Sequence, residues 1–261
     1  MVSVPLFVVP TIVPPTYFSS QIMSRVMSNL RETSWRFYAL TGLGANRLTL
    51  FMSLQRDPRI NILAYAGHGS PERICGEGVI CNMITVEDAS WLKDKIICAL
   101  PACETAHTLG PELVSKGVRA FFGSDDTMFA AFTEIEHNYF EDWVDYTTTF
   151  YKALFSGRPF GECAEAYKYK ASQYIEWYKS KIAEWPNADW YVSSATRNRD
   201  GFKLIGNPAD KLEPPLKAEA PALALGDIRD VLLSFSATAA IMVATTVAPI
   251  AYKELKERKI I

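Results

Sequence analysis

The sequence predicts an α/β fold, a doubly wound and mostly parallel sheet with helices on both faces. Short apolar runs, typical of buried strands, alternate along the chain with segments whose apolar residues recur every three or four positions, as in helices. This alternation is typical of βαβ units. The chain has 261 residues, of which 49% are hydrophobic and 21% charged, which is enough for a full hydrophobic core.

The apolar runs that predict strands are residues 5–9, 60–66, 95–100, 118–122 and 202–205. Helices are expected at 18–30, 45–55, 106–115 and, as two long helices, within 129–185, interrupted at Gly157-Arg158-Pro159. In the second helix, Leu48, Phe51 and Met52 fall on one side. Thr85, with Asp88 three residues later, predicts the start of a short helix that runs through Trp91-Leu92. The aromatic residues after 129 are expected to be core.

The sequence divides into a domain at 1–212, a linker at 213–229 rich in Pro and Ala, an apolar segment at 230–252 and a basic tail at 253–261. Because about 20 apolar residues span a bilayer as a helix, the segment predicts a transmembrane helix. Its Ser and Thr residues and Pro249 leave open a buried or oligomerisation helix. The amino terminus, Met1 to Val13, has no basic residue and is broken by Pro5 and Pro10, so it predicts no secretory signal.

Charge and cysteine content exclude several classes of function. The net charge is −2 and no basic stripe occurs, which argues against a nucleic-acid partner. Five cysteines at irregular spacing do not indicate a disulfide framework. Cys98 and Cys163 fit small buried residues of a strand and a helix. Cys75 and Cys81 lie in a Gly-containing loop, but their spacing matches no common zinc site, so no metal or other cofactor is expected.

Two phrases carry the candidate chemistry: Tyr65-Ala66-Gly67-His68-Gly69-Ser70 and Leu100-Pro101-Ala102-Cys103-Glu104. Each follows a predicted strand, and the carboxyl ends of parallel strands meet in one crevice where ligands bind. A thiol and an imidazole placed there make a nucleophile and its proton-handling partner. His68 and Cys103 are therefore the predicted catalytic residues.

The surroundings of Cys103 suggest how charge would be stabilised. Cys103 is expected where a strand turns into a helix, so that the helix's free N–H groups and dipole favour a thiolate and later an oxyanion. The backbone N–H groups of Gly69 and Cys103 are the predicted oxyanion donors, and Glu104 fits the first turn of that helix. His107 and His137 are the alternative imidazoles, but only His68 stands directly after a strand between two glycines.

These phrases resemble the caspase–gingipain–legumain superfamily of cysteine peptidases (clan CD). In that group a strand ends in His-Gly, here His68-Gly69, and a later strand ends in Ala-Cys or Ser-Cys, here Ala102-Cys103. The segment 117–123 and the phrase Leu204-Ile205-Gly206-Asn207-Pro208 resemble the gingipain and CHAT branch, although Asn207 stands where Asp is usual. The resemblance covers roughly residues 60–210. It implies a caspase-like sheet and peptide-bond hydrolysis after a chosen P1 residue.

The same resemblance implies that His68 protonates the leaving amine without a tight ion pair to Cys103. It also implies that the loop after the strand following the nucleophile lines the P1 pocket. Asp125 and Asp126 lie in that loop, and buried carboxylates there would select Arg or Lys. The alternative is that both aspartates cap the segment beginning near Thr127-Met128.

The expected function is a cysteine endopeptidase that acts through a thioester acyl-enzyme on a protein or peptide substrate. The chain is expected to be anchored in a membrane by its carboxyl-terminal helix. Because the sequence predicts no export signal, the peptidase domain is expected in the cytoplasm. A catalytically silent, membrane-tethered adaptor with the same fold is the alternative. A flavodoxin-like nucleotide-binding domain is disfavoured because no Gly-rich phosphate loop appears. The sequence does not predict the oligomeric state.

Overall fold

The computed structural model of the chain describes residues 3–11, 14–76, 82–128 and 137–215. The chain separates into two compact units, Met1–Lys217 and Ala218–Ile261, and the second lies outside the described residues. The transmembrane helix expected at 230–252 and the tail at 253–261 therefore fall outside them. Within the described part, no helix combines the length and the apolar character needed to cross a bilayer.

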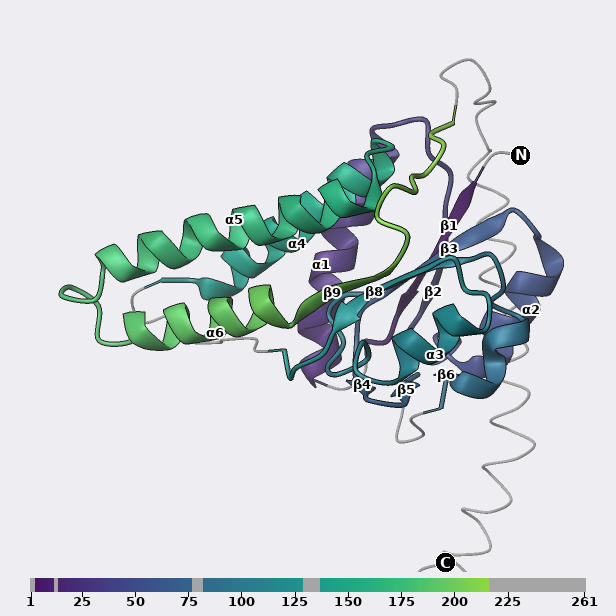
Figure 1. Cartoon of the computed structure of the whole chain (residues 1–261), viewed down its shortest axis with the longest axis horizontal. Helices are drawn as coiled ribbons and strands as arrows, with labels where there is room; N and C mark the ends of the chain where they lie inside the picture. Colours follow the sequence, from purple (N-terminus) through teal and green to yellow (C-terminus); the bar gives the residue numbers. More distant parts are fainter. Residues whose placement is uncertain (1–2, 12–13, 77–81, 129–136, 216–261) are drawn as a thin grey trace, which may run out of the picture. The chain divides into compact units, whose positions relative to one another are not determined.

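The first unit is built on a six-stranded sheet in the order β2-β1-β3-β7-β8-β9 (Figure 1). The first five strands of this order are parallel, and β9 runs antiparallel to β8. This confirms the α/β class and the mostly parallel sheet. The strands are β1 (Val4–Val9), β2 (Tyr38–Thr41), β3 (Ile60–Tyr65), β7 (Ile96–Ala99), β8 (Ala120–Ser124) and β9 (Phe202–Gly206).

Helices cover both faces of the sheet. One hydrophobic core joins the sheet to α1 (Pro14–Arg31), α4 (Tyr139–Phe155) and α5 (Phe160–Ser180). The other joins it to α2 (Arg47–Arg56), the short 3-10 helix η2 (Val86–Ser90) and α3 (Leu109–Ser115). Successive residues of β3 point to opposite faces, so Ile62 belongs to the first core and Leu63 to the second.

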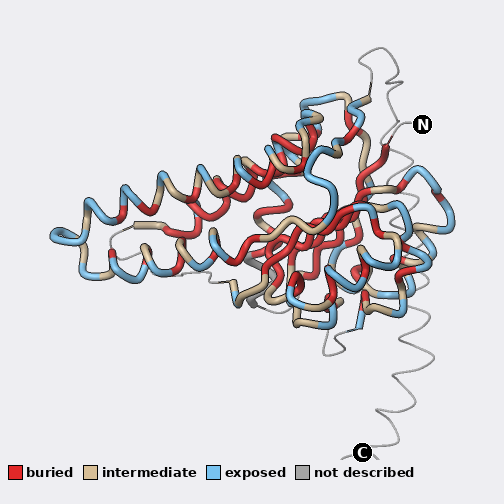
Figure 2. Tube along the Cα trace, viewed as in Figure 1, coloured by how far each residue is buried: buried red, intermediate tan, exposed pale blue. Residues whose placement is uncertain are grey.

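Helices α4, α5 and α6 (Ala188–Gly201) extend beyond the sheet as a helical arm (Figure 1). They bury the sides that face one another and expose the outer sides (Figure 2). The interior of the arm is rich in aromatic rings, as the sequence predicts for Tyr139, Trp143 and Tyr146. Asn198 in α6 is fully buried and donates hydrogen bonds to the hydroxyls of Tyr139 and Tyr146, at 3.3 and 3.1 Å.

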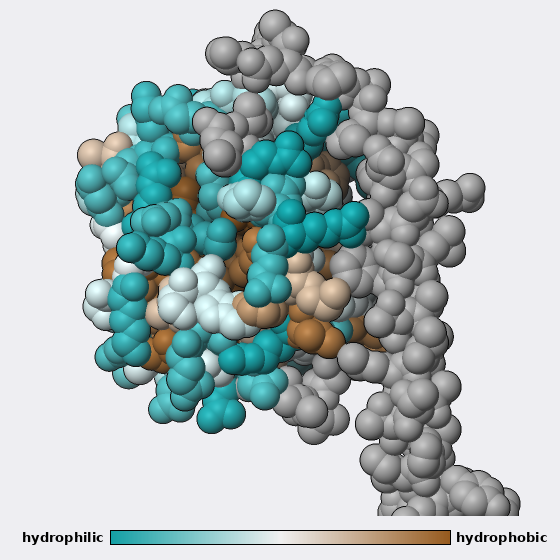
Figure 3. Space-filling view, turned by 90° about the vertical axis from the view of Figure 1, so that its right-hand side faces the viewer, coloured by the Kyte–Doolittle hydropathy of each residue, from teal (hydrophilic) through white to brown (hydrophobic). Residues whose placement is uncertain are grey.

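Several expectations about local structure need correction. The helix expected at 106–115 begins only at Leu109, because residues 103–108 form turns. On α2 the buried residue is Leu50, whereas Leu48 and Met52 are each 47% exposed. Figure 3, which views the side of the molecule near α2, shows hydrophobic areas separated by hydrophilic side chains. The N-cap at Thr85 is confirmed, since its backbone N–H donates to the Asp88 carboxylate at 2.8 Å.

The loop expected between residues 71 and 82 contains one strand of a second, small sheet, and the other two strands flank this loop. The small sheet is antiparallel, in the order β4-β5-β6, with β4 at Gly69–Ser70, β5 at Arg73–Ile74 and β6 at Ile84–Thr85. The remaining short element, the 3-10 helix η1 (Gly42–Gly44), leads from β2 to α2. Strand β4 begins at the residue after His68, so this small sheet fixes the backbone on one side of the candidate site.

Candidate active site

The two predicted phrases leave neighbouring strands at the same edge of the sheet. Strands β3 and β7 pair in parallel, with Tyr65 opposite Ala99. Beyond the strands the pairing continues in the loops, because Leu100 N–H donates to the Tyr65 carbonyl at 3.0 Å and Gly67 N–H donates to the Pro101 carbonyl at 2.9 Å. The His68 loop and the Cys103 loop are thus hydrogen-bonded to each other.

Gly69 brings the two loops into close contact. A Cβ atom at this position would lie 2.6 Å from the carbonyl oxygen of Cys103 and 3.2 Å from the Cβ of Ala102, and it would overlap the side chain of Thr105. Such distances leave no room for a side chain. The small residues that the sequence places beside His68 and Cys103 are therefore required by the packing of one loop on the other.

The two candidate catalytic side chains differ in exposure. His68 is exposed and Cys103 is half-buried. Within the described part of the chain, no hydrogen bond joins the Cys103 Sγ to the His68 imidazole, and Sγ accepts one from Met128 N–H at 3.4 Å. The thiol is thus partly covered by protein, and the imidazole on the adjoining loop is open to solvent.

Cys103 lies in a turn and not at the start of a helix, which corrects the expectation of a helix dipole at the thiol. Its neighbour Glu104 has a positive φ of 57°, so Glu104 is not a first-turn helix residue either. Helix α3 starts six residues after Cys103, at Leu109. The turn is fixed by β8 and the residues after it, because Glu104 N–H donates to the Asp126 carbonyl at 3.1 Å and Ala106 N–H to the Ser124 carbonyl at 2.8 Å.

The electrostatic surroundings keep Cys103 protonated at rest. Burial raises the pKa of the Cys103 thiol above its ordinary value, and the nearby Glu104 and Asp126 carboxylates raise this pKa further. Hydrogen bonds from the backbone N–H groups of Met128 and Cys103 act in the opposite direction without overcoming burial. A thiolate at neutral pH would therefore require a base that accepts the Cys103 proton.

The backbone N–H of Gly69 faces away from β5. In an antiparallel pair, hydrogen-bonded and non-hydrogen-bonded residue pairs alternate. Cys75 N–H donates to the His68 carbonyl at 3.1 Å, so the adjacent pair of Gly69 and Ile74 is of the non-hydrogen-bonded kind. The Gly69 amide is thus directed toward the edge of β4 that does not pair with β5.

Asp125 and Asp126 lie at the end of β8, beside the Cys103 turn, and each carboxylate already has a cationic partner. Arg197 of α6 contacts both carboxylate oxygens of Asp126, at 2.7 and 3.1 Å, and lowers the pKa of Asp126. Lys203 of β9 lies 3.1 Å from Asp125. The Asp126 carboxylate also accepts a hydrogen bond from Thr127 N–H at 2.7 Å. A helix cap would accept from the second or third residue onward, and the residues from 129 to 136 lie outside the described part, so the capping alternative stays a prediction.

The other two histidines have different surroundings. His107 is exposed, and its Nδ1 lies 3.2 Å from the Thr108 hydroxyl. His137 contacts Asp142 through Nε2 at 2.5 Å and stacks on Trp185 in the helical arm. His137 is therefore a structural residue, as the sequence suggests.

The cysteines other than Cys103 are structural in the described residues. Cys98 and Cys163 are buried free thiols, as expected. Cys75, in contrast, is disulfide-bonded, which corrects the expectation of no disulfide; its partner lies outside the described residues. An odd cysteine count does not exclude a single disulfide. No group of side chains suited to hold a metal ion occurs among the described residues.

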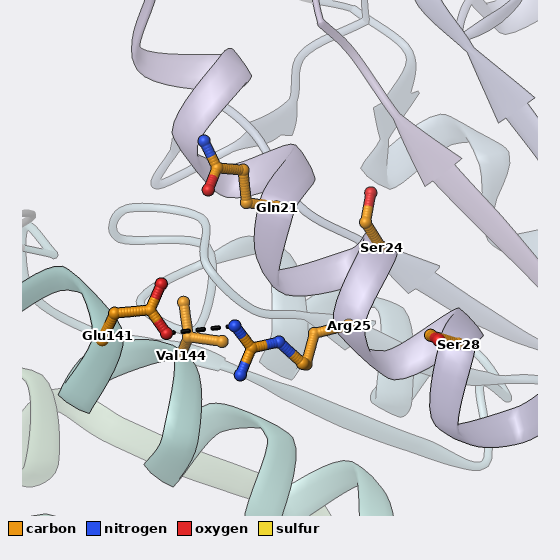
Figure 4. Close-up of a pocket in the computed structure, with 6 residues that line it drawn as sticks. All are labelled: Gln21, Ser24, Arg25, Ser28, Glu141 and Val144. Atoms are coloured by element: carbon orange, nitrogen blue, oxygen red, sulfur yellow. Dashed lines mark hydrogen bonds and ion pairs between the residues drawn. The ribbon is translucent and has the colours of Figure 1, made fainter.

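Two cavities of similar size lie away from the His68 and Cys103 loops. A polar pocket of about 330 Å³ lies between α1 and α4, where Arg25 and Glu141 form an ion pair across it (Figure 4). A more apolar cavity of about 320 Å³ lies by the ends of α1 and α4 and includes Pro214 and Pro215. Neither of these two cavities is lined by His68 or Cys103.

Sequence reasoning missed Tyr65, the last residue of β3, as part of the site. Its hydroxyl lies within hydrogen-bond distance of the His68 and Cys75 carbonyls. A tyrosine that follows three aliphatic residues at the end of a buried strand, three positions before the histidine, is the signal that could have identified it. Comparison with known proteins gives no match, either to a protein-family model or to a curated protein.

Proposed function

We propose that this chain is a cysteine endopeptidase of caspase-like fold, with Cys103 as nucleophile and His68 as proton donor. The single observation that carries the proposal is the direct contact between the two loops at one edge of the sheet, through Gly67 N–H and the Pro101 carbonyl and through Gly69 against Cys103. A solvent-accessible imidazole and a half-buried thiol in such loops are the groups that acyl transfer needs.

In the proposed reaction, the Cys103 thiol gives up its proton to His68 and the sulfur attacks the scissile carbonyl carbon. The N–H groups of Gly69 and Cys103 donate to the oxyanion. His68 then transfers the proton to the leaving amine as the C–N bond breaks, which leaves a thioester. Water attacks the thioester carbon and gives its proton back through His68 to sulfur, which restores the thiol. No metal or organic cofactor takes part.

A preference for Arg or Lys at P1 is the finer part of the proposal. Asp125 and Asp126 adjoin the Cys103 turn and carry the charge that would select a cation. Because Arg197 and Lys203 already pair with them, a basic P1 side chain would have to share or replace these partners. The ion pairs are partly exposed, and exposed pairs exchange at little cost, on the order of 1 kcal/mol or less.

A peptide library tests the activity and the P1 preference together. Wild type is expected to cleave library peptides, and Cys103→Ala and His68→Ala are expected to lose cleavage by at least about a hundredfold. If wild-type protein cleaves the library peptides no faster than Cys103→Ala, the proposed peptidase activity is rejected. Neutral residues dominating P1 would reject only the role of Asp125 and Asp126.

One observation favours the catalytically silent adaptor as the second candidate. Burial and two nearby carboxylates raise the pKa of Cys103, so the resting thiol is a weak nucleophile. A peptidyl acyloxymethyl ketone ending in Arg or Lys discriminates the two functions. Labelling of Cys103 that requires His68 supports the enzyme, and a thiol that remains unlabelled supports the adaptor.

A further inference from the structure

Tyr65 connects the two halves of the candidate site through its side chain and its main chain. The residue is 1% exposed, and its hydroxyl oxygen lies 2.8 Å from the His68 carbonyl oxygen and 2.6 Å from the Cys75 carbonyl oxygen. The His68 carbonyl also accepts the Cys75 N–H at 3.1 Å. One buried hydroxyl thus serves both strands that flank the turn after His68.

The main chain of Tyr65 supports the other loop. Its carbonyl accepts the N–H of Leu100 at 3.0 Å, which lies directly before Pro101, Ala102 and Cys103. Between these contacts, Gly67 passes so close to the phenol that a Cβ at Gly67 would overlap the Tyr65 hydroxyl. Both loops are therefore built around this one residue.

The His68 imidazole depends on this support. It is exposed, and within the described residues its ring nitrogens have no hydrogen-bond partner. No hydrogen bond within the described part of the chain therefore holds the ring, so its location depends on the backbone that carries it. That backbone is held by the Tyr65 hydroxyl at the His68 carbonyl and by the Cys75 N–H.

We infer that Tyr65 is a positioning residue for the proposed dyad, with its hydroxyl holding the His68 backbone at the place from which the imidazole reaches the leaving group. The inference rests on the proposed function. The Tyr65→Phe substitution keeps the ring and the Leu100 contact and removes the hydroxyl alone. It is expected to impair the steps that need His68, above all the protonation of the leaving amine, and to leave binding intact.

Two probes separate that step from the rest of the reaction. An internally quenched peptide has an amine leaving group, which must be protonated, whereas the p-nitrophenyl ester of the same acyl part releases a phenolate that needs no proton at neutral pH. Tyr65→Phe is expected to lower kcat for the peptide about tenfold with KM little changed. Turnover of the ester still needs His68 to accept the thiol proton and to assist thioester hydrolysis, but not to protonate a leaving group, so it is expected to fall by a clearly smaller factor than turnover of the peptide. If Tyr65→Phe only weakened the fold, turnover of the peptide and of the ester would fall by the same factor.

A double-mutant cycle identifies the group through which Tyr65 acts. With His68→Ala already present, Tyr65→Phe is expected to add no further loss on the peptide, because both changes remove the same contribution. Tyr167→Phe is the matched control, since it removes another buried hydroxyl, 3.4 Å from the Asn198 carbonyl in the helical arm. Melting temperatures of all variants report any general loss of folding.

The outcomes distinguish this inference from the proposed function. Wild-type protein that cleaves neither probe overturns the proposed function and the inference with it. Wild-type cleavage together with unchanged peptide kcat in Tyr65→Phe overturns the inference alone. Equal losses on the peptide and on the ester, or losses that add to those of His68→Ala, overturn it as well.

Discussion

At the scale of single residues, the candidate site depends both on a glycine that leaves room for close packing and on the charged side chains around Cys103. Gly69 fits against Cys103 and Ala102 only because it has no Cβ. The polar groups around Cys103 determine its protonation, since Glu104 and Asp126 oppose the thiolate. Packing and charge at these few positions therefore decide how readily the proposed nucleophile can act.

Gly69→Ala is expected to disturb the site more than the fold. The added methyl would meet the Cys103 carbonyl at 2.6 Å, so the two loops must separate, at a cost of about 1–3 kcal/mol. Cleavage of the library peptides is expected to fall more than about tenfold. Gly44→Ala is the matched control, because a Cβ at Gly44 has no atom within 4 Å. Equal activities of the two variants would contradict the packing argument.

Glu104→Gln is expected to make Cys103 more reactive. The Glu104 charge raises the pKa of the thiol, so its removal lowers that pKa and increases the thiolate fraction at any given pH. The rate of alkylation by iodoacetamide, measured from pH 7 to 10, should shift toward lower pH. Glu112→Gln on α3 is the control, with no expected shift. An unchanged profile in Glu104→Gln would show that its charge does not reach the sulfur.

At the scale of elements, the sequence predicts the strands and helices whose buried residues form a regular apolar pattern, and it misses those without such a pattern. Strands β1, β3, β7 and β8 are buried at nearly every position and appear as apolar runs. Strand β2 is exposed or half-exposed at three of its four residues, and its apolar run, residues 37–40, is only four residues long and is not among the predicted strands. Helix α6 buries Ser194 and Asn198, and polar residues on the inner side conceal its amphipathic pattern.

The candidate site shows the same division. The positions of His68 and Cys103 after neighbouring strands follow from the apolar runs and the topology of parallel sheets. The turn after Cys103 does not, because it depends on a positive φ at Glu104 and on hydrogen bonds to Ser124 and Asp126, far along the chain. Periodicity within a segment contains no information about such long-range contacts.

Asp57, between α2 and β3, gives this part of the fold a defined pH dependence. A hydrogen bond from the Arg59 side chain lowers the pKa of Asp57 from 3.8 to about 2, and the Tyr38 hydroxyl donates to the same carboxylate at 3.0 Å. Because the pKa is lower in the folded state, the stabilisation is present above about pH 5 and is lost as the pH falls toward 2.

Asp57→Asn is therefore expected to lower the free energy of unfolding by about 1 kcal/mol at neutral pH, after allowance for the solvent around the exposed Arg59 side chain. The difference from wild type should shrink between pH 5 and pH 2, as followed by urea unfolding. Glu165→Gln, at an exposed position of α5, is the control. A difference that stays constant with pH would contradict the role of the carboxylate charge.

At the scale of the whole molecule, the helical arm and the candidate site are connected. Arg197 of α6 binds the Asp126 carboxylate, and the backbone of Asp126 accepts the N–H of Glu104 beside the nucleophile. The arm is thus not a separate appendage of the sheet, since one of its side chains contacts the residues that shape the Cys103 turn.

Membrane attachment through residues 230–252 remains a prediction that belongs to this scale. The full chain is expected to float with liposomes and to resist extraction at high pH. Ile241→Asp places a charge in the middle of the apolar segment, where it costs about 2.5–3.5 kcal/mol in a bilayer, and is expected to move the protein to the soluble fraction. Ser234→Thr is the control. A wild-type chain found wholly in the soluble fraction would reject the anchor.

The direct bonding between the two loops sets a limit on how this chain can be re-engineered. Two residues lie between Tyr65 and His68 and three between Ala99 and Cys103, and both stretches start from strand positions that face each other. An insertion in the hairpin between Ser70 and Arg73 leaves these intervals intact. One extra residue inside either interval would displace the His68 imidazole or the Cys103 sulfur relative to the other, even if every other side chain kept its place.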